Sequence, residues 1–267
     1  MLPTGVKNLL IVNVLFFLAT YVFQAAKGID LNEYLALYYV ADGHFHFWQY
    51  FTYMFMHANL DHIFFNMFAL WMFGYVLENL WGTRRFLFFY LFCGLGAALF
   101  NTLVNAGIYH HMVNAVNLYA QNPNPDAFMQ LVQGNFKHYY NHSAVAQFVG
   151  EWRNAAASSD YALQSVQLAQ QLADYRVSIP TVGASGAIYG ILLAFGMTFP
   201  EERIYLYFLV PLKAKWFVIG YVAIELFEGI FRSTDGIAHF AHLGGMLFGL
   251  ILILIWRRQA RNRWRIN

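Results

Sequence analysis

The chain has 267 residues, of which 59% are hydrophobic and only 11% are charged, and its formal net charge is +2. Soluble domains contain about 25% charged residues, so this composition excludes an ordinary cytosolic enzyme and a disordered chain, and the small net charge does not indicate nucleic-acid binding. Long uncharged blocks instead predict an all-α, multi-pass membrane protein. The single cysteine, Cys93, lies in one such block, which excludes an intrachain disulfide.

Six apolar blocks predict six membrane-spanning helices, because a span needs about 20 mostly apolar residues. The assignment of block 215–231 as a span is weaker than the other five, since this block contains Glu225 and Glu228. We interpret the short segment 204–212 as an interfacial connection. The blocks are, in chain order, 9–26, 62–77, 86–109, 179–200, 215–231 and 237–256.

The distribution of Lys and Arg predicts the orientation of the spans. These residues are concentrated in the connections after the second and fourth blocks and in the basic tail 257–267. The positive-inside rule therefore places both termini in the cytoplasm.

The segment 107–179 is polar, and we predict that it is an insert on the outer side of the membrane. Its second half, 155–175, has apolar residues at helical spacings, and Pro123 and Pro125 mark a turn before it. The chain is thereby divided into spans one to three (1–106), the insert, spans four to six (180–256) and the tail.

Polar side chains are costly in a span, so each is a candidate functional residue. Ser185, His242, His62 and Asn66 all lie near the N-terminal ends of even-numbered spans, which the predicted orientation places on the outer side. An imidazole can take the proton of a serine hydroxyl, so Ser185 and His242 are the candidate nucleophile and base. His62 and Asn66 lie four residues apart, on one helix face, and are candidate donors to an oxyanion.

Glycines predict close contact between the two helices that carry this pair. Gly186 and Gly190 in span four, and Gly245 and Gly249 in span six, form the small-xxx-small pattern of touching membrane helices. Tyr189 lies one turn after Ser185, and we expect its ring to stack on the imidazole of His242.

No carboxylate is placed as a third catalytic group by the sequence. Asp235 precedes His242 by seven residues and is expected in a loop, so we predict a Ser-His dyad. A serine in a membrane helix, taken alone, is more often a hydroxyl bonded to its own helix, and paired glycines alone imply only packing. The prediction depends on the fact that these independent features lie at one depth in the membrane and on its outer side.

Three stretches together resemble the rhomboid intramembrane serine proteases. They are Gly183-Ala184-Ser185-Gly186 followed by Tyr189, Ala241-His242 followed by Gly245 and Gly249, and Met56-His57-Ala58-Asn59-Leu60-Asp61-His62-Ile63-Phe64-Phe65-Asn66. The resemblance implies that Ser185 is the nucleophile, His242 the base, and His62 and Asn66 the oxyanion donors. It makes His57 a structural histidine of the first outer loop, and places Glu78, Gly82 and Arg84 at the turn after span two.

The sequence departs from the rhomboid pattern at two places. The family's frequent Trp-Arg pair reads Trp48-Gln49, which puts the charged tether of the first outer loop in doubt, and the insert 107–179 is unusually long. Only His242 has glycines three and seven residues later, so we interpret His239 as a loop or rim residue. The compact six-span size, judged by the family, suggests a bacterial inner membrane.

These observations predict an endopeptidase that cleaves single-span membrane proteins near the outer face of the bilayer, with no cofactor and no metal. The partners of the insert are unknown, and no nucleic acid is expected. Two alternatives stay open. One is a non-catalytic rhomboid-like factor that binds membrane proteins for quality control, and the other is a small transporter that uses His62, His242, Glu225 and Glu228 as a proton path.

Overall fold

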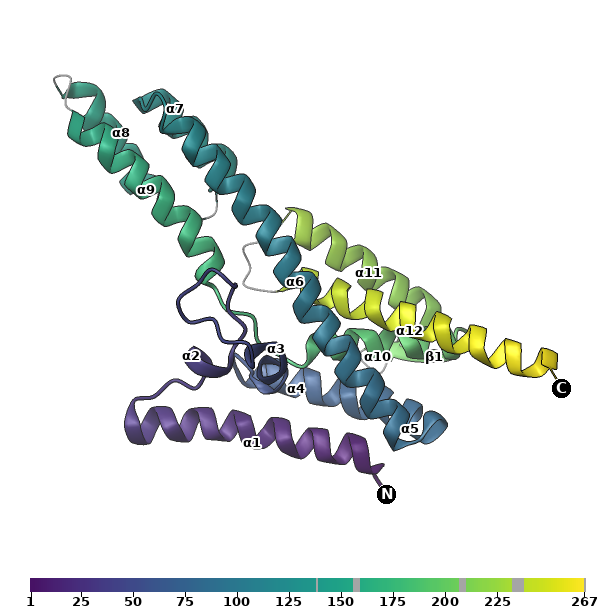
Figure 1. Cartoon of the computed structure of the whole chain (residues 1–267). Coiled ribbons are helices and arrows are strands. Elements are labelled where there is room, and N and C mark those ends of the chain that lie inside the picture. Colours follow the sequence, from purple (N-terminus) through teal and green to yellow (C-terminus); the bar gives the residue numbers. More distant parts are fainter. Residues whose placement is uncertain (138, 156–158, 207–209, 232–237, 267) are drawn as a thin grey trace. The chain divides into compact units, whose positions relative to one another are not determined.

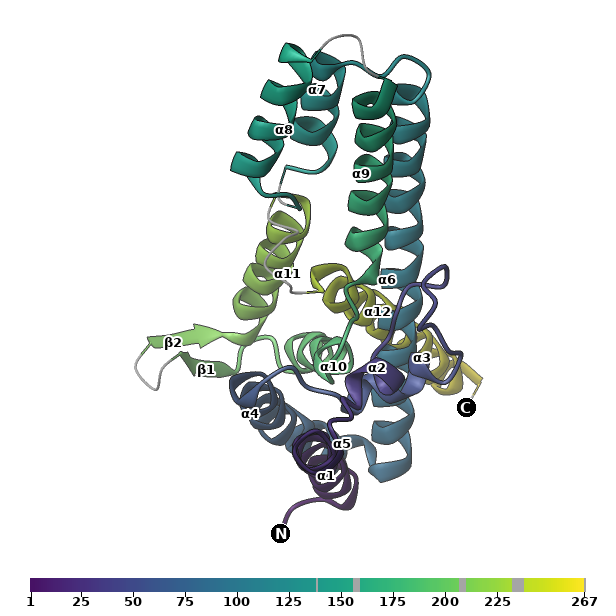
Figure 2. The ribbon, with the colours of Figure 1, turned by 90° about the vertical axis from the view of Figure 1, so that its left-hand side faces the viewer.

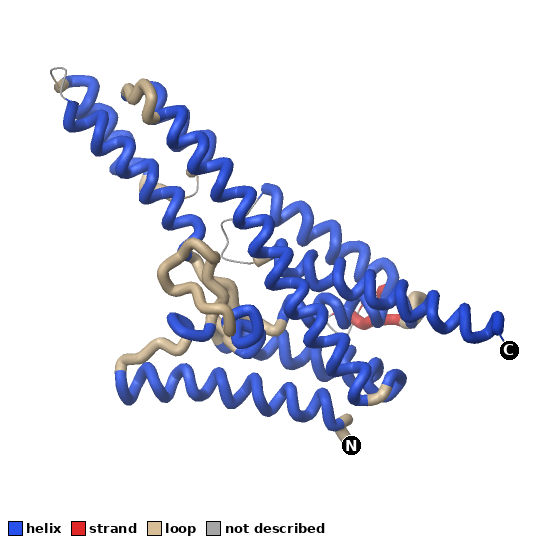
Figure 3. The backbone as a smooth tube through the Cα atoms, in the orientation of Figure 1, coloured by secondary structure: helices blue, strands red, loops and turns tan. Residues whose placement is uncertain are grey.

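The computed structural model describes residues 1–137, 139–155, 159–206, 210–231 and 238–266. These residues are mostly helical, with one small antiparallel hairpin (Figures 1 and 3). Their contacts divide the chain into two compact units, Met1–Thr102 with Thr181–Asn267, and Leu103–Pro180.

The first unit contains the helices that correspond to the six apolar blocks. A 3-10 turn, η1 (Tyr53–Phe55), precedes α4 (Leu60–Ala69), and a π-helical turn, η2 (Leu70–Gly74), joins α4 to α5 (Tyr75–Trp81). The helices are α1 (Thr4–Lys27), α2 (Asn32–Leu35), α3 (Gln49–Thr52), α4 (Leu60–Ala69), α5 (Tyr75–Trp81), the first part of α6 (Thr83–Tyr119), α10 (Ser185–Thr198), α11 (Ala214–Phe231) and α12 (His239–Ile266).

Four helices in the described part of the chain are long and apolar enough to cross a membrane: Thr4–Lys27, Leu60–Trp81, Thr83–Tyr119 and His239–Arg261. Helix α10 is apolar but shorter, and α11 carries three charged residues, Lys215, Glu225 and Glu228. The fold therefore fits the expected all-α membrane protein, whereas the full set of six spans stays a prediction.

Helix α10 lies at the centre of the first unit. It packs against α12, α11, α4 and the π-helical turn η2, and Figure 2 shows it between α4 and α12. Its buried apolar residues, such as Ile191 and Ala194, join one apolar cluster with α1, α5, α6 and α12. The candidate nucleophile is thus carried by the most enclosed helix of this unit.

A buried carboxylate joins the N-terminus of α1 to the end of α5. Glu78 is only 2% exposed, and its two oxygens accept hydrogen bonds of 2.7 Å from the backbone N–H groups of Gly5 and Val6. The hydroxyl of Thr83 donates to the same carboxylate at 2.7 Å. Because the first N–H groups of a helix have no partner within it, Glu78 acts as a cap supplied by a distant segment.

The segment after α10, expected to be an interfacial connection over 204–212, contains a hairpin, and its place at the interface stays a prediction. Strand β1 (Arg203–Leu206) pairs with β2 (Val210–Lys213) in an antiparallel hairpin, with Arg203 opposite Lys213. Pairing between the two strands satisfies backbone groups of this segment.

The second unit consists of the last part of α6 with α7 (Pro125–Asn135), α8 (His142–Asn154) and α9 (Ser159–Ser178). Asn124 caps α7 by accepting a hydrogen bond from the N–H of Ala127, and Pro125 follows it at the first helical position. A separate apolar cluster, which includes Phe128 and Phe136, forms its core. The helix expected over 155–175 is present as α9, while the position of this unit on the outer side stays a prediction.

Candidate active site

Ser185 is the first residue of α10 and is half-buried. The first backbone N–H groups of a helix have no intrahelical acceptor, and the helix dipole adds partial positive charge there. Gly183, two residues earlier, has φ +122°, which favours glycine. The serine hydroxyl therefore lies at a helix end whose free N–H groups can stabilise a negative charge.

His242 lies in the first turn of α12 and is 8% exposed. Its Nε2 atom is 2.8 Å from Oγ of Ser185, within hydrogen-bond distance. The structure thus brings together the two residues that the sequence predicts as nucleophile and base, which lie 57 positions apart in the chain.

Tyr189 holds the imidazole of His242 from one side. The two rings are stacked, with centroids 4.1 Å apart and an interplanar angle of 8°, which confirms the expected stacking. The hydroxyl of Tyr189 donates a hydrogen bond to Oε1 of Glu225 on α11. Tyr189 therefore links the imidazole to a carboxylate that the sequence did not place in the site.

Glu225 lies against the far nitrogen of the candidate base. Its Oε2 is 3.0 Å from Nδ1 of His242, a close contact that lacks the alignment of a hydrogen bond, and among the described groups this Nδ1 has no hydrogen-bond partner. The expectation that no carboxylate accompanies the pair was therefore wrong. Asp235, the carboxylate considered from sequence, lies outside the described residues. The sequence signal that could have placed Glu225 in the site is its position in the apolar helix α11, because a carboxylate is costly there.

His239 is also placed differently from the prediction. It is the first residue of α12, is 5% exposed rather than on a rim, and its Nδ1 is 2.7 Å from the same oxygen of Glu225. The glycine spacing singles out His242 as the base but carries no information on the burial of His239. Glu225, His239 and His242 together offer three ligand atoms of the types that bind metals, all within 4.8 Å of one another.

His62, in the first turn of α4, is aimed at the start of α10. Its Nδ1 accepts a hydrogen bond of 3.4 Å from the N–H of Ala58, so the ring proton is on Nε2. A Cβ added to Gly183 would lie 2.7 Å from that Nε2 and 3.4 Å from Oγ of Ser185. His62 therefore presents an N–H donor beside the candidate nucleophile, and Gly183 leaves the room for it.

Asn66 lies one turn after His62, on the same face of α4. It is 6% exposed, and its Nδ2 has no hydrogen-bond partner among the described residues. A buried amide donor without a partner costs free energy and is typical of a site that awaits an acceptor.

His57 contributes to the support of His62. The two rings meet edge to face with centroids 5.1 Å apart. Burial, followed by the neighbouring His62, lowers the pKa of His57 to about 4, so this ring is neutral at physiological pH. That agrees with a structural position in the loop before α4.

The four predicted glycines form a seam between α10 and α12. A Cβ on Gly245 would lie 1.8 Å from the carbonyl oxygen of Gly186, and a Cβ on Gly249 would lie 3.3 Å from Cα of Gly190. The thiol of Cys93, on α6, fills the same junction: a Cβ on Gly190 would lie 2.5 Å from its Sγ. Backbone contact along this seam sets the distance between Ser185 and His242.

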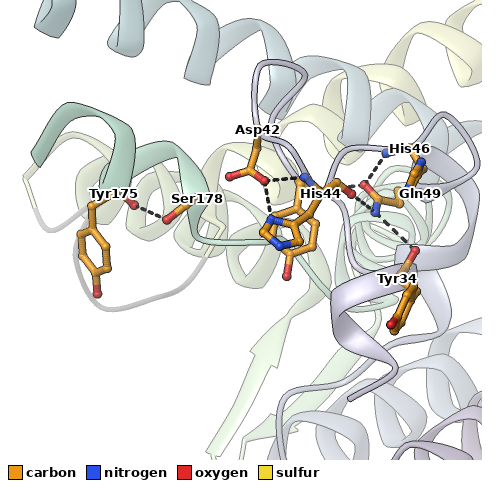
Figure 4. A network of polar contacts seen from close by, with 8 residues as sticks. Tyr34, Asp42, His44, His46, Gln49, Tyr175 and Ser178 are labelled. Carbon is orange, nitrogen blue, oxygen red and sulfur yellow. Dashed lines mark hydrogen bonds and ion pairs between the residues drawn. The ribbon is translucent and has the colours of Figure 1, made fainter. Parts of the chain in front are cut away.

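A neutral amide stands where the resemblance expected a charged tether in the first loop. Gln49 is fully buried and its Oε1 accepts from the N–H groups of Tyr38 and His46, at 3.3 and 3.1 Å. Its Nε2 donates to the carbonyl oxygens of Tyr34 and His44, at 3.3 and 2.8 Å. Figure 4 shows the hydrogen bonds of Gln49 to Tyr34, His44 and His46. The four hydrogen bonds of the Gln49 amide therefore hold the first loop in place of a charged side chain.

We expect Gln49→Ala to lower the free energy of unfolding by about 2 kcal/mol, because the buried N–H group of Tyr38 and the partly buried N–H group of His46 lose their acceptor. The measurement is thermal or denaturant unfolding in detergent micelles. Gln133→Ala, at an exposed position of α7, is the matched control and should change stability by less than about 0.5 kcal/mol. Equal stability of the two variants would contradict a tethering role for Gln49.

Comparison with known proteins identifies the family of this chain. The family model described as "Rhomboid domain" matches residues 44–111 and 99–259. An uncharacterized mitochondrial rhomboid protein of Schizosaccharomyces pombe is 26% identical over 218 residues, which cover 78% of this chain and 51% of that protein. The chain thus spans about half the length of the curated relative it matches. The chain belongs to the rhomboid family and is an integral, multi-pass membrane protein.

Proposed function

We propose that this protein is a serine endopeptidase that cleaves single-span membrane proteins near the outer face of the membrane. The observation that carries the proposal is the 2.8 Å contact between Nε2 of His242 and Oγ of Ser185 at the N-terminus of α10. Membership of the rhomboid family supports the same chemistry and a substrate that lies in the lipid bilayer. The presence of both residues argues against a purely non-catalytic rhomboid-like factor.

In the proposed reaction, Oγ of Ser185 attacks the scissile carbonyl carbon while Nε2 of His242 takes the hydroxyl proton. The carbonyl oxygen becomes an oxyanion, for which the free N–H groups of the first turn of α10, Nε2–H of His62 and Nδ2 of Asn66 are the candidate donors. His242 then gives its proton to the leaving amine, and the acyl-enzyme is hydrolysed by water in a second, equivalent step.

Glu225 has a positioning role in this mechanism. Taking the serine proton converts His242 to an imidazolium, and a carboxylate oxygen 3.0 Å from its Nδ1 stabilises that positive charge. Stacking on Tyr189 fixes the plane of the ring while the proton moves between the two reacting groups. The proposed centre is therefore a Ser-His pair supported by a carboxylate.

Access to the scissile bond requires local unwinding of the substrate helix, because helical peptide groups are bonded to one another and lipid offers them no other partner. Substrates with helix-weakening residues near their outer ends should therefore be preferred. The proposal keeps both termini in the cytoplasm and the unit 103–180 on the outer side, in a bacterial inner membrane.

We expect a fluorophosphonate probe to label the wild-type protein at one site and to leave Ser185→Ala unlabelled, because only an activated hydroxyl attacks phosphorus readily. The measurement is in-gel fluorescence followed by identification of the modified peptide. Ser143→Ala, at an exposed serine of α8, is the matched control and should be labelled like the wild type. Equal labelling of Ser185→Ala would overturn the assignment of the nucleophile.

A further inference from the structure

We infer that Glu225, His239 and His242 form a binding site for a divalent transition-metal ion, Zn²⁺ in particular, and that metal bound there switches the protease off. The second half of this inference rests on the proposed function. Each residue offers one ligand atom, and the three atoms lie within 4.8 Å of one another. Imidazole nitrogen and carboxylate oxygen are ligands that Zn²⁺ prefers, and two histidines with one glutamate form a known three-ligand set with an open fourth position.

The distances between the ligand atoms suit a metal ion after a small adjustment. Oε2 of Glu225 is 2.7 Å from Nδ1 of His239 and 3.0 Å from Nδ1 of His242. Ligand atoms around a tetrahedral Zn²⁺ are roughly 3.3 Å apart, given metal–ligand distances near 2.0 Å. The ion fits where the two contacts of Glu225 widen by a few tenths of an ångström and the two histidine nitrogens, which lie within 4.8 Å of each other, take up the same spacing.

Burial and the surroundings of Nδ1 of His242 single out this cluster. The side chains of His239 and Glu225 are each 6% exposed, and that of His242 is 10% exposed. Nδ1 of His242 is buried beside the carboxylate without a hydrogen-bond partner among the described groups. Nδ1 faces Oε2 of Glu225 at 3.0 Å without the alignment of a hydrogen bond, and a cation between the two atoms would bond to both.

A second layer of contacts already holds the ligands in place. The Tyr189 hydroxyl donates to Oε1 of Glu225 and leaves Oε2 facing the two histidines. The same tyrosine ring stacks on His242. Hydrogen-bonded carboxylates and oriented imidazoles are the usual outer support of protein metal sites.

Metal binding and catalysis make opposite demands on His242. A metal ion needs the lone pair of Nδ1, so the proton of the neutral ring moves to Nε2. Nε2–H then donates to Oγ of Ser185 and cannot take its proton, so the general base is lost. Removal of the metal restores a free Nε2 lone pair. Mg²⁺ and Ca²⁺, which prefer oxygen ligands, should have little effect.

Metal binding is tested on the full-length, detergent-solubilised protein without a polyhistidine tag. Competition with a chromogenic chelator should reveal one tight Zn²⁺ per chain, and Co²⁺ should give the intense visible bands of a tetrahedral site. Glu225→Gln and His239→Gln should each bind Zn²⁺ at least about 10-fold more weakly, whereas His110→Gln, at an exposed histidine of α6, should bind like the wild type. Wild-type protein with neither Zn²⁺ competition nor Co²⁺ bands would overturn the site, whether or not the variants fold. Unchanged affinity in both variants would also overturn it.

Inhibition is tested with a transmembrane substrate, each variant being compared with its own metal-free rate. Zn²⁺ should lower wild-type cleavage at least 10-fold, EDTA should restore it, and equal Mg²⁺ should leave it unchanged. His239→Gln should need at least 10-fold more Zn²⁺ for the same inhibition. Tight Zn²⁺ binding with an unchanged rate would overturn the switch. Tight binding by a protein that cleaves nothing would overturn the proposed function while supporting the metal site.

Discussion

Ser185→Ala and His242→Ala are each expected to lower the rate of cleavage of a transmembrane substrate by roughly 10³-fold or more. Oγ of Ser185 is the proposed nucleophile, and Nε2 of His242, 2.8 Å away, is the proposed base that activates it. The measurement is the initial rate of product formation in micelles and in proteoliposomes.

Non-additivity provides a sharper test of the same pair. Because the nucleophile and its base act as one unit, the double variant should be no slower than either single variant. Thr198→Ala, at the other end of α10, is the control and should cleave at nearly the wild-type rate. Cleavage by Ser185→Ala at the wild-type rate would rule out the serine mechanism, and a multiplicative loss in the double variant would show that the two residues act separately.

Gly245→Ala is expected to destabilise the first unit by about 3 kcal/mol or more. The added Cβ would lie 1.8 Å from the carbonyl oxygen of Gly186, and both contacting groups belong to helix backbones that no rotamer change can move. Helices α10 and α12 must therefore separate, which also draws Ser185 away from His242. Unfolding in a series of detergent–denaturant mixtures measures the loss.

Gly220→Ala is the matched control for this substitution. Gly220 lies in α11 with nothing within 4 Å of an added Cβ, and alanine is the better helix former by about 1 kcal/mol. We expect this variant to be as stable as the wild type or slightly more stable. If Gly245→Ala were equally stable, the backbone contact between α10 and α12 would not be required for the fold.

The local features of the site followed from sequence because each depends on spacing along one helix. The four-residue intervals in 183–190 and 242–249 predict which helix faces meet, and the placement of Tyr189 one turn after Ser185 predicts the stacking on His242. Glu225 and His239 were missed for the opposite reason. Their meeting depends on the rotation of α11 against α12, and no periodicity within either helix specifies that rotation.

The first loop and the hairpin show the same limit. The pair Trp48-Gln49 stands out in the sequence because it departs from the family pattern. The four hydrogen bonds of Gln49, however, reach backbone groups up to 15 residues away. Backbone groups are the same in every residue type, so the sequence does not indicate which of them Gln49 binds. Strands β1 and β2 are short, and the described part of the hairpin satisfies backbone groups rather than burying a periodic apolar face. Such elements are set by tertiary context rather than by composition.

The position of Cys93 gives the protein a native chemical reporter. It is the single cysteine of the chain, it is fully buried, and Cβ atoms on Gly190 and Gly249 would lie 2.5 and 3.3 Å from its Sγ. A membrane-permeant maleimide can react with this thiol only when α6, α10 and α12 separate. The modification rate in intact bilayers therefore measures how often the helices around the active site come apart, with no introduced label.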